Sequence, residues 1–337
     1  MKQIGYAVIF LMFVIIFIPL VLVKGCSQSS TQPKTKKAEE TQLTIKVYIT
    51  EEDKVVEMNF NEYLKGVVAA EMPASFHIEA LKAQAVAART YVYHRLINNE
   101  KNGIDVPEHK GADICTNPAH CKAWISKKKA LEKWGLLSSG KYWDKISKAV
   151  DETTDMIITY EHEPIDAVFH STSSGRTENS EEVWANTIPY LRSVISEGEE
   201  ASPKFTSKLE ITLTEFKEKL SSVRPEIKFE GNPGDFIEKF EKTEGGSIKT
   251  IRIGGCDFKG TEIRKIFELN SANFTITIDN DKVVFNVKGN GHGVGMSQYG
   301  ANYLAQQGKY YEEILKHYYK DVEIVKMSEE LNAKIKN

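Results

Sequence analysis

The chain opens with a long apolar run. Ile4–Val23 contains no charged side chain and is about 20 residues long, which is enough to cross a bilayer as a helix. No small-residue cleavage site follows it, which favours an uncleaved anchor over a secretory signal peptide. A lipoprotein signal at Cys26 fits poorly because Lys24 precedes that cysteine so closely. We therefore expect residues 1–3 to form a cytoplasmic stub and residues 4–23 a transmembrane signal anchor.

A polar segment without any apolar period follows the apolar run. Residues 24–43 are rich in serine, threonine, glutamine and lysine. Such a composition cannot bury a core, so we expect a flexible linker. The folded part is expected to begin near Thr44 and to lie outside the cytoplasm.

Apolar periodicity predicts a strand and two helices at the start of the folded part. Thr44–Thr50 (TIKVYIT) alternates as a strand does, and VVEMNF behind it is expected to pair with it as a hairpin. Asn61–Ala70 predicts a short helix and His77–Asn98 a long one, because apolar residues recur there at helical spacing. Pro73 separates the two helices.

The rest of the chain mixes helical and strand patterns. Helical spacing recurs over Lys141–Thr153, Thr214–Leu220, Ser297–Gln307 and Tyr311–Tyr319. Strand-like runs are MIITY, IDAVFH, TIRIGG, NFTITID and VVFNVKG. Strands and helices do not alternate regularly, so the sequence predicts an α+β fold of mixed helices and antiparallel strands.

Composition and charge narrow the class of protein. Of the 337 residues, 41% are hydrophobic, which is enough for a sizeable core. The formal net charge is −3, and no basic arm is present. A nucleic-acid-binding role is therefore not expected.

A single carboxylate, Glu71, stands at the end of the first predicted helix behind a small apolar run. An exposed glutamate at a helix end is the commoner arrangement. The alternative is a general acid, because apolar surroundings raise a carboxyl pKa and allow the group to hold a proton near neutral pH. The long helix behind it carries polar candidates for ligand contact on an alanine-rich surface: Lys82, Gln84, Arg89 and Tyr91.

Four residues with metal-ligating side chains lie within one loop: His109, Cys115, His120 and Cys121. Two thiolates and two imidazoles can complete a tetrahedral zinc site without an open position, so the metal would have a structural role. The alternative is a Cys115–Cys121 disulfide, which an extracytoplasmic domain permits. A disulfide would leave both histidines unexplained.

Two further stretches carry polar groups that could contact a ligand. HSTSSG places His170 and Ser171 at the end of a predicted strand, where they point to opposite faces and do not form a catalytic pair. GNGHGVGMSQYGA is rich in glycine but has neither phosphate-loop nor dinucleotide spacing. Its glycines allow the backbone to bring His292, Ser297 and Gln298 close to a ligand.

Three of these stretches together resemble the stage II sporulation protein D family of peptidoglycan lytic transglycosylases. The stretches are AAEMPASFHIEALKAQAVAARTY, HSTSSG with VW and PYLRSV behind it, and GHGVGMSQYGA. They stand in the family's order, and the loop with the histidines and cysteines resembles the zinc loop of clostridial members. One departure is HSTSSG, where many members have two glycines after the serine and this chain has Ser174 and Gly175. The resemblance implies a catalytic domain over residues 44–325, built around a glycan-binding groove and followed by a C-terminal tail, residues 326–337.

The resemblance also implies a mechanism and a set of site residues. Glu71 would protonate the glycosidic oxygen between N-acetylmuramic acid (MurNAc) and N-acetylglucosamine (GlcNAc). It would then act as base on the C6 hydroxyl, which closes a 1,6-anhydro ring. One carboxylate suffices because the substrate supplies its own nucleophile, whereas ordinary glycosidases use two. The implied groove residues are Lys82, Arg89, Tyr91, His170, Ser171 and His292.

The cellular setting implied by the resemblance is engulfment during endospore formation. The enzyme would sit in the mother-cell engulfing membrane and act on glycan strands stripped of stem peptides. Its expected partners are a sporulation peptidoglycan amidase and a polytopic membrane scaffold. Two alternatives stay open: a non-catalytic cell-wall adaptor or amidase activator, and a zinc hydrolase. An intact Glu71 counts against the first, and a metal loop with four protein ligands counts against the second.

Overall fold

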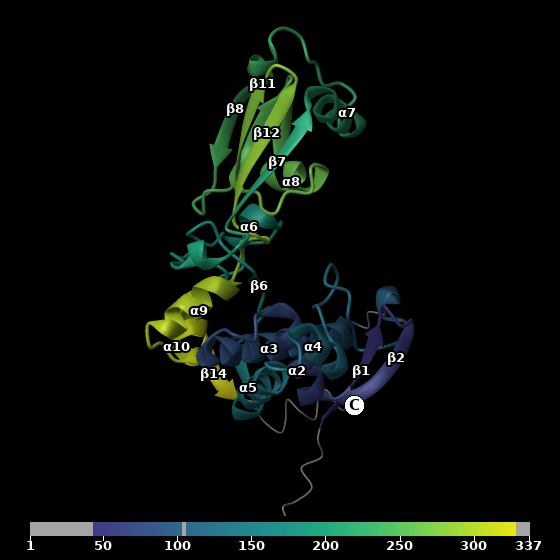
Figure 1. Ribbon diagram of the computed structural model, residues 1–337, viewed down its shortest axis with the longest axis vertical. Helices are drawn as coiled ribbons and strands as arrows, with labels where there is room; N and C mark the ends of the chain where they lie inside the picture. Colours follow the sequence, from purple (N-terminus) through teal and green to yellow (C-terminus); the bar gives the residue numbers. More distant parts are fainter. Residues whose placement is uncertain (1–42, 103–105, 328–337) are drawn as a thin grey trace, which may run out of the picture. The chain divides into compact units, whose positions relative to one another are not determined.

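The computed structural model describes residues 43–102 and 106–327 (Figure 1). The predicted stub, the predicted anchor, nearly all of the predicted linker and most of the predicted tail lie outside the described residues. Within the described ranges, no helix combines the length and apolarity needed to span a bilayer.

A three-stranded sheet begins the described chain. β1 (Thr44–Ile49) and β2 (Lys54–Asn59) form the predicted antiparallel hairpin. β3 (Ile114–Cys115) pairs in parallel with β1, so that Tyr48 lies opposite Cys115. This pairing holds the loop with the histidines and cysteines beside the start of the domain.

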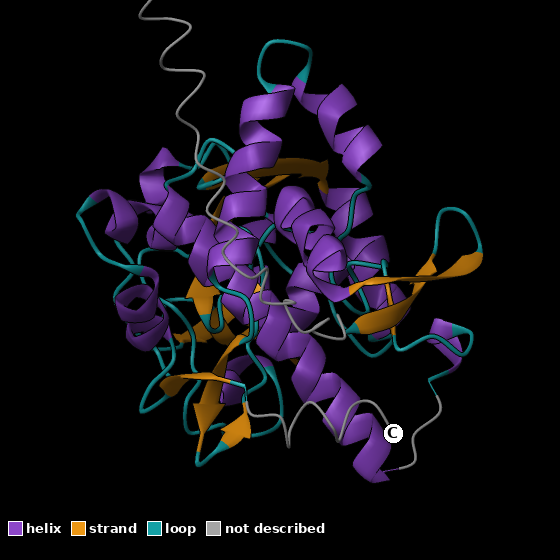
Figure 2. Cartoon of the chain, turned by 90° about the horizontal axis from the view of Figure 1, so that it is seen from below, coloured by secondary structure: helices purple, strands orange, loops and turns teal. Residues whose placement is uncertain are grey.

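The first hydrophobic core is built around one long helix. α2 (Phe60–Glu71) starts at Asn59, whose side chain accepts a hydrogen bond from the backbone N–H of Glu62. α3 (Ile78–Asn102) contacts α2, and its alanine-rich surface allows further helices to pack closely. Those further helices are α5 (Ser139–Glu152), α9 (Gln298–Gln306) and α10 (Tyr311–Tyr318). Figure 2 shows these helices crossing one another, with strands at the edges of the cluster.

Short strands fix the segments that approach these helices. β6 (Phe169–His170) pairs in parallel with β13 (Met296–Ser297), which brings the glycine-rich segment against HSTSSG. An antiparallel sheet is formed by β4 (Met156–Tyr160), β5 (Glu163–Pro164) and β14 (Glu323–Lys326). The helices α4 (Lys127–Trp134) and α6 (Ser180–Val183) complete this part of the chain.

A second hydrophobic core is formed by residues between Leu209 and Val287. One antiparallel sheet has the order β11–β12–β7, with β7 (Thr206–Thr212), β11 (Phe274–Asp279) and β12 (Lys282–Lys288). The other has the order β10–β9–β8, with β8 (Ile237–Lys242), β9 (Ile248–Ile253) and β10 (Cys256–Lys259). The helices α7 (Leu213–Val223) and α8 (Gly260–Ile266) pack against these sheets. Phe216, Phe267 and Phe285 pack ring against ring inside this core.

The predicted α+β class is confirmed. The predicted helices are present with ends shifted by a few residues, except that α3 runs to Asn102. The predicted strand IDAVFH shortens to β6. Ten helices and strands of the described chain were not predicted: α4, α6, α8, β3, β5, β7, β8, β10, β13 and β14. Cys256 in the second core is free and half-buried.

Candidate active site

Glu71 is the last residue of α2, and the chain leaves the helix directly behind it. Met72 is extended, with φ −116° and ψ 144°, because a proline follows it and disfavours the helical conformation. The Glu71 Oε1 atom accepts a hydrogen bond of 2.9 Å from the backbone N–H of Ala123. The end of the helix therefore sets the backbone position of the carboxyl group, and the Ala123 N–H orients it.

The surroundings of Glu71 act on its pKa in two directions. Burial raises the pKa of this carboxyl group above its usual value, and that is the largest effect. The positive charge of Lys122, the N–H of Ala123 and the side-chain amide of Gln298 lower the pKa and offset part of the rise. The site thus favours the neutral acid while retaining groups that stabilise the carboxylate.

The carboxyl group faces a pocket with a volume of about 460 Å³. The residues that line it come from α2, α3, the loop before α4, the turns around β6 and the glycine-rich segment. They are Glu71, Tyr91, Arg95, Pro118, Ala119, Cys121, Lys122, Ala123, Asp166, Val168, Phe169, Trp184 and His292. The 40% exposed Trp184 and the charged side chains of the lining suit a carbohydrate, which presents both apolar ring faces and hydroxyl groups.

Lys122 is a site residue that the sequence analysis missed. Its Nζ atom lies 4.1 Å from the ring centroid of Tyr91 and 3.9 Å from that of Phe169. Burial lowers the pKa of Lys122 to about 8. This buried cation, held over two rings, lines the same pocket as Glu71 and lowers the pKa of that carboxyl group. The available signal was its position directly behind Cys121, where closure of the loop fixes it.

Two glutamines predicted as ligand contacts lie behind Glu71. Gln298 is the first residue of α9, and its side-chain amide lies near enough to the Glu71 carboxyl group to lower the pKa of that group. Its Nε2 atom also donates to Oε1 of Gln84 at 3.4 Å. Both side chains are buried, and Nε2 of Gln84 has no partner among the described residues. Ser297 fixes this arrangement as the N-cap of α9, where its hydroxyl oxygen accepts from the N–H of Gly300.

His292 lines the pocket as a neutral imidazole. Its Nδ1 accepts from the backbone N–H of Val294, and its Nε2 donates to the carbonyl of Phe169, both at 3.1 Å. Burial lowers the pKa of His292 far below the usual value. The ring lies 5.2 Å from that of Trp184, centroid to centroid. His292 therefore contributes shape and packing and carries no charge.

His170 and Ser171 do not line the Glu71 pocket. His170 is buried, and its Nδ1 lies 3.1 Å from the carbonyl oxygen of Val294. Burial lowers the pKa of His170 to about 4, so its ring is neutral. The half-buried Ser171 places its hydroxyl 3.1 Å from that of Thr172. Both residues support the backbone next to the pocket.

Lys82 and Arg89 were expected in the groove, and the structure places both elsewhere. Lys82 forms ion pairs with Glu79 at 2.8 Å and with Glu152 at 2.9 Å. The guanidinium of Arg89 is buried and donates to backbone carbonyl groups at the end of α5 and the start of β4, those of Val150, Thr153 and Met156. These contacts tie α3 to its neighbours, which is a structural role.

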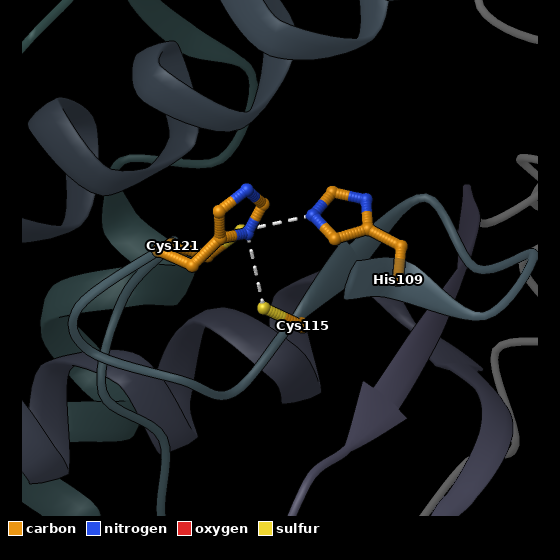
Figure 3. Close-up of side chains that lie close together, drawn as sticks. His109, Cys115 and Cys121 are labelled. Atoms are coloured by element: carbon orange, nitrogen blue, oxygen red, sulfur yellow. Dashed lines mark hydrogen bonds between the residues drawn. The ribbon is translucent and has the colours of Figure 1, made fainter. Parts of the chain in front are cut away.

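The four predicted metal ligands come together at one point (Figure 3). One donor atom from each of His109, Cys115, His120 and Cys121 lies within 4.8 Å of the other three. Nε2 of His109 is 3.1 Å from Sγ of Cys121, and Nδ1 of His120 is 3.4 Å from both sulfur atoms. Neighbouring donors in a tetrahedral zinc site are about 3.5 Å apart, so the four atoms fit such an ion.

The alternative to a metal site in this loop is a disulfide between Cys115 and Cys121. Both cysteines are free in this structure, so the predicted alternative of a disulfide is not what the structure contains. Burial raises the pKa of the Cys121 thiol to about 12, and a bound dication would turn such a thiol into a thiolate. Burial also lowers the pKa of His109, which leaves its imidazole neutral and able to bind a metal. The donor set fits zinc, and the loop then continues directly into Lys122 and Ala123.

The chain is similar to known proteins over most of its length. A family model described as "Stage II sporulation protein" matches residues 48–160. The stage II sporulation protein D of Bacillus subtilis (strain 168) is 39% identical over 307 residues, which covers 90% of this chain and 86% of that protein. Its counterpart from Bacillus amyloliquefaciens is 38% identical over 305 residues, covering 89% and 85%. The amidase enhancer of Bacillus subtilis (strain 168) is 29% identical over 308 residues, covering 76% of this chain and 39% of that protein. The chain therefore belongs to the stage II sporulation protein D family.

Proposed function

We propose that this protein is a lytic transglycosylase that cleaves the MurNAc–GlcNAc bond of peptidoglycan glycan strands stripped of their peptides. The observation that carries the proposal is Glu71, whose pKa burial raises, in a pocket that combines an exposed tryptophan with hydrogen-bonding groups. Family membership supports the same chemistry.

In the first step Glu71 acts as a general acid. Its neutral carboxyl group donates a proton to the glycosidic oxygen as the bond to C1 of MurNAc breaks. The carboxylate that remains is stabilised by the Ala123 N–H, by the Gln298 amide and by the charge of Lys122. These three groups therefore act where negative charge develops.

In the second step the Glu71 carboxylate acts as a base. It takes the proton from the C6 hydroxyl of MurNAc as that oxygen attacks C1, which closes the 1,6-anhydro ring and returns Glu71 to its acid form. One carboxyl group thus serves both steps, and atoms balance without water.

Hydrolysis is the second candidate, and one observation favours it. Asp166 lines the same pocket as Glu71, and glycoside hydrolases use two carboxyl groups. An Asp166 that activates water would give reducing ends in place of anhydro ends. The chemical identity of the product separates the two reactions.

A non-catalytic activator of an amidase is the third candidate. It is supported by the relative named amidase enhancer. Such an activator has no use for a carboxyl group held at a raised pKa in a pocket, which is why we favour the enzyme.

We further propose that the four clustered side chains hold one structural zinc ion. His109, Cys115, His120 and Cys121 would supply all four ligands, which leaves no position for an activated water. Bound zinc would close the loop and fix Lys122 and Ala123 next to Glu71.

The proposal includes a setting. The catalytic part would lie outside the cytoplasm, anchored by residues 4–23 in the mother-cell engulfing membrane. An amidase that strips stem peptides and a polytopic scaffold would be its partners. Support comes from the family and from the relative named amidase enhancer.

The role of Glu71 is tested by Glu71→Gln in the full-length protein. Because the amide cannot donate or accept the catalytic proton, we expect glycan turnover to fall by a factor of about 10³ or more while glycan binding persists. Glu62→Gln, at the exposed start of the same helix, is the matched control and should retain full activity. Normal turnover by Glu71→Gln would assign the acid to another residue.

A further inference from the structure

A second, larger pocket lies where three strands of one sheet share an end. It has a volume of about 690 Å³ and is lined by the start of β7, the start of β11, the end of β12 and the turn between β8 and β9. Lys208, Lys242 and Lys288 are its only charged lining residues, so the described lining contains no acidic side chain. The pocket is therefore a local region of positive potential on a chain whose net charge is −3.

The three ammonium groups are available to a ligand. Neither Lys242 nor Lys288 forms an ion pair with any described residue, and Lys208 has only an exposed contact of 3.3 Å with Glu210. Asn273 and Asn286 also line the pocket and add hydrogen-bonding amides. Exposed lysines beside amides suit carboxylate groups carried on a polar polymer.

A narrow hollow shares lining residues with both the basic pocket and the Glu71 pocket. Ser174, Asn273 and Lys288 line both the basic pocket and this narrow polar hollow of about 20 Å³. His292 lines that hollow and also the Glu71 pocket. A ligand longer than a few sugars that occupies the Glu71 pocket therefore has a positively charged surface within reach.

We propose that the basic pocket binds free carboxylates of the same glycan strand that Glu71 cleaves. This inference rests on the proposed function. Every MurNAc residue carries a lactyl group, whose carboxyl is tied up in an amide while a stem peptide is attached and becomes a free carboxylate when the peptide is removed. Lys208, Lys242 and Lys288 would then favour stripped strands by charge, at a distance from the reacting bond.

Equilibrium binding to full-length protein carrying Glu71→Gln tests this subsite without turnover. The probes are peptide-free strands with free lactyl carboxylates and the same strands after conversion of those carboxylates to methylamides. We expect the free-carboxylate strands to bind roughly tenfold more tightly, as three exposed ion pairs would give. Combined Lys208→Gln, Lys242→Gln and Lys288→Gln should abolish this difference. The matched control combines three exposed lysines of the same core that do not line the pocket: Lys228→Gln, Lys239→Gln and Lys265→Gln.

Three outcomes would overturn the subsite. The first is an unchanged preference in the pocket variant, and the second is an equal loss of affinity for both kinds of strand. The third is tighter binding of a glycerol-phosphate polymer than of the stripped strands, which would assign the pocket to a phosphodiester. Product analysis on protein with Glu71 intact is independent of all three, since anhydro products with no carboxylate preference would remove the subsite and leave the proposed reaction standing.

Discussion

In the proposed reaction Glu71 serves first as an acid and then as a base, and its neighbours favour one or the other of these two forms. Burial raises the pKa of the carboxyl group and thereby favours its protonated form. The carboxylate form, which acts as the base, is stabilised by Ala123, Lys122 and Gln298. Removing any of these three should therefore shift the pKa of Glu71 upward, because each of them favours the charged form.

Gln298→Ala tests this balance. Loss of the amide raises the pKa of Glu71 further, so the alkaline limb of the kcat/KM profile against pH, which reports loss of the acid form, should move to higher pH. The less stabilised carboxylate and looser positioning should lower kcat about tenfold. Gln306→Ala, at the exposed end of the same helix, should leave both unchanged. An alkaline limb that stays in place or moves to lower pH would contradict this role for Gln298.

The polar residues of α3 show how far individual site residues could be predicted from the sequence. Lys82 and Arg89 are seven residues apart and share one face of the helix, and Gln84 and Tyr91 share another. The structure places the second pair toward Glu71 and the first pair against α5 and β4. The prediction treated all four as ligand contacts because all four are polar. Their helical spacing would have separated them into two pairs on different faces of α3. Lys122 lies in a loop without periodicity. Its place directly behind Cys121 is a sequence signal, but that place does not indicate the contacts with Tyr91 and Phe169.

At the scale of elements, the glycine-rich segment works by close backbone approach. Gly295 has φ +71°, and a Cβ atom placed there would lie 2.2 Å from the carbonyl oxygen of Val168. The backbone of β13 can therefore bond β6 only if this residue has no side chain. That pairing positions both His292 and the start of α9.

Gly295→Ala should lower the free energy of unfolding by about 3 kcal/mol, because it adds a backbone clash to an unfavourable left-handed conformation. Gly308→Ala is the matched control. Gly308 has φ +87° but no atom within 4 Å of the added Cβ, so only the conformational cost of about 1 kcal/mol is expected. Denaturant unfolding monitored by circular dichroism measures both. Equal losses in the two variants would mean that the close approach to Val168 is not important.

The metal-ligand loop gives a second prediction at this scale. The purified protein should contain about one zinc ion per chain by elemental analysis, and Cys115→Ser should lose it, with unfolding easier by on the order of 3 kcal/mol. Cys256→Ser alters a free, half-buried cysteine away from the cluster and should retain the metal. A metal-free native protein with Cys115 and Cys121 oxidised to each other would establish the disulfide instead.

Elements with strong periodicity were predictable, and those with mixed patterns were not. The long run of small apolar residues in α3 and the alternation in β1, β11 and β12 gave clear signals. α4 was missed because its sequence, KKKALEKW, is mostly charged and buries only Ala130. β8 was missed because five of its six residues are exposed and it shows no buried face. The ligand loop was predictable because its chemistry depends on residue type and not on periodicity.

At the scale of the whole molecule, the described chain gathers distant segments at one carboxyl group. The end of α2, the loop behind Cys121, the turn after β5 and the start of α9 all meet at the Glu71 pocket. The two hydrophobic cores consist of different residues, and the basic pocket belongs to the strands of the second. We therefore expect that mutation can alter the proposed reaction and the proposed strand selection separately.

Mass spectrometry of the products from peptide-free glycan strands tests the central claim most directly. The full-length protein should release strands that end in 1,6-anhydroMurNAc, each one water molecule lighter than the hydrolysed equivalent, and the Glu71→Gln protein should release none. Reducing ends that incorporate oxygen from ¹⁸O-labelled water would contradict the account, because they would show that water, and not the C6 hydroxyl, attacks C1.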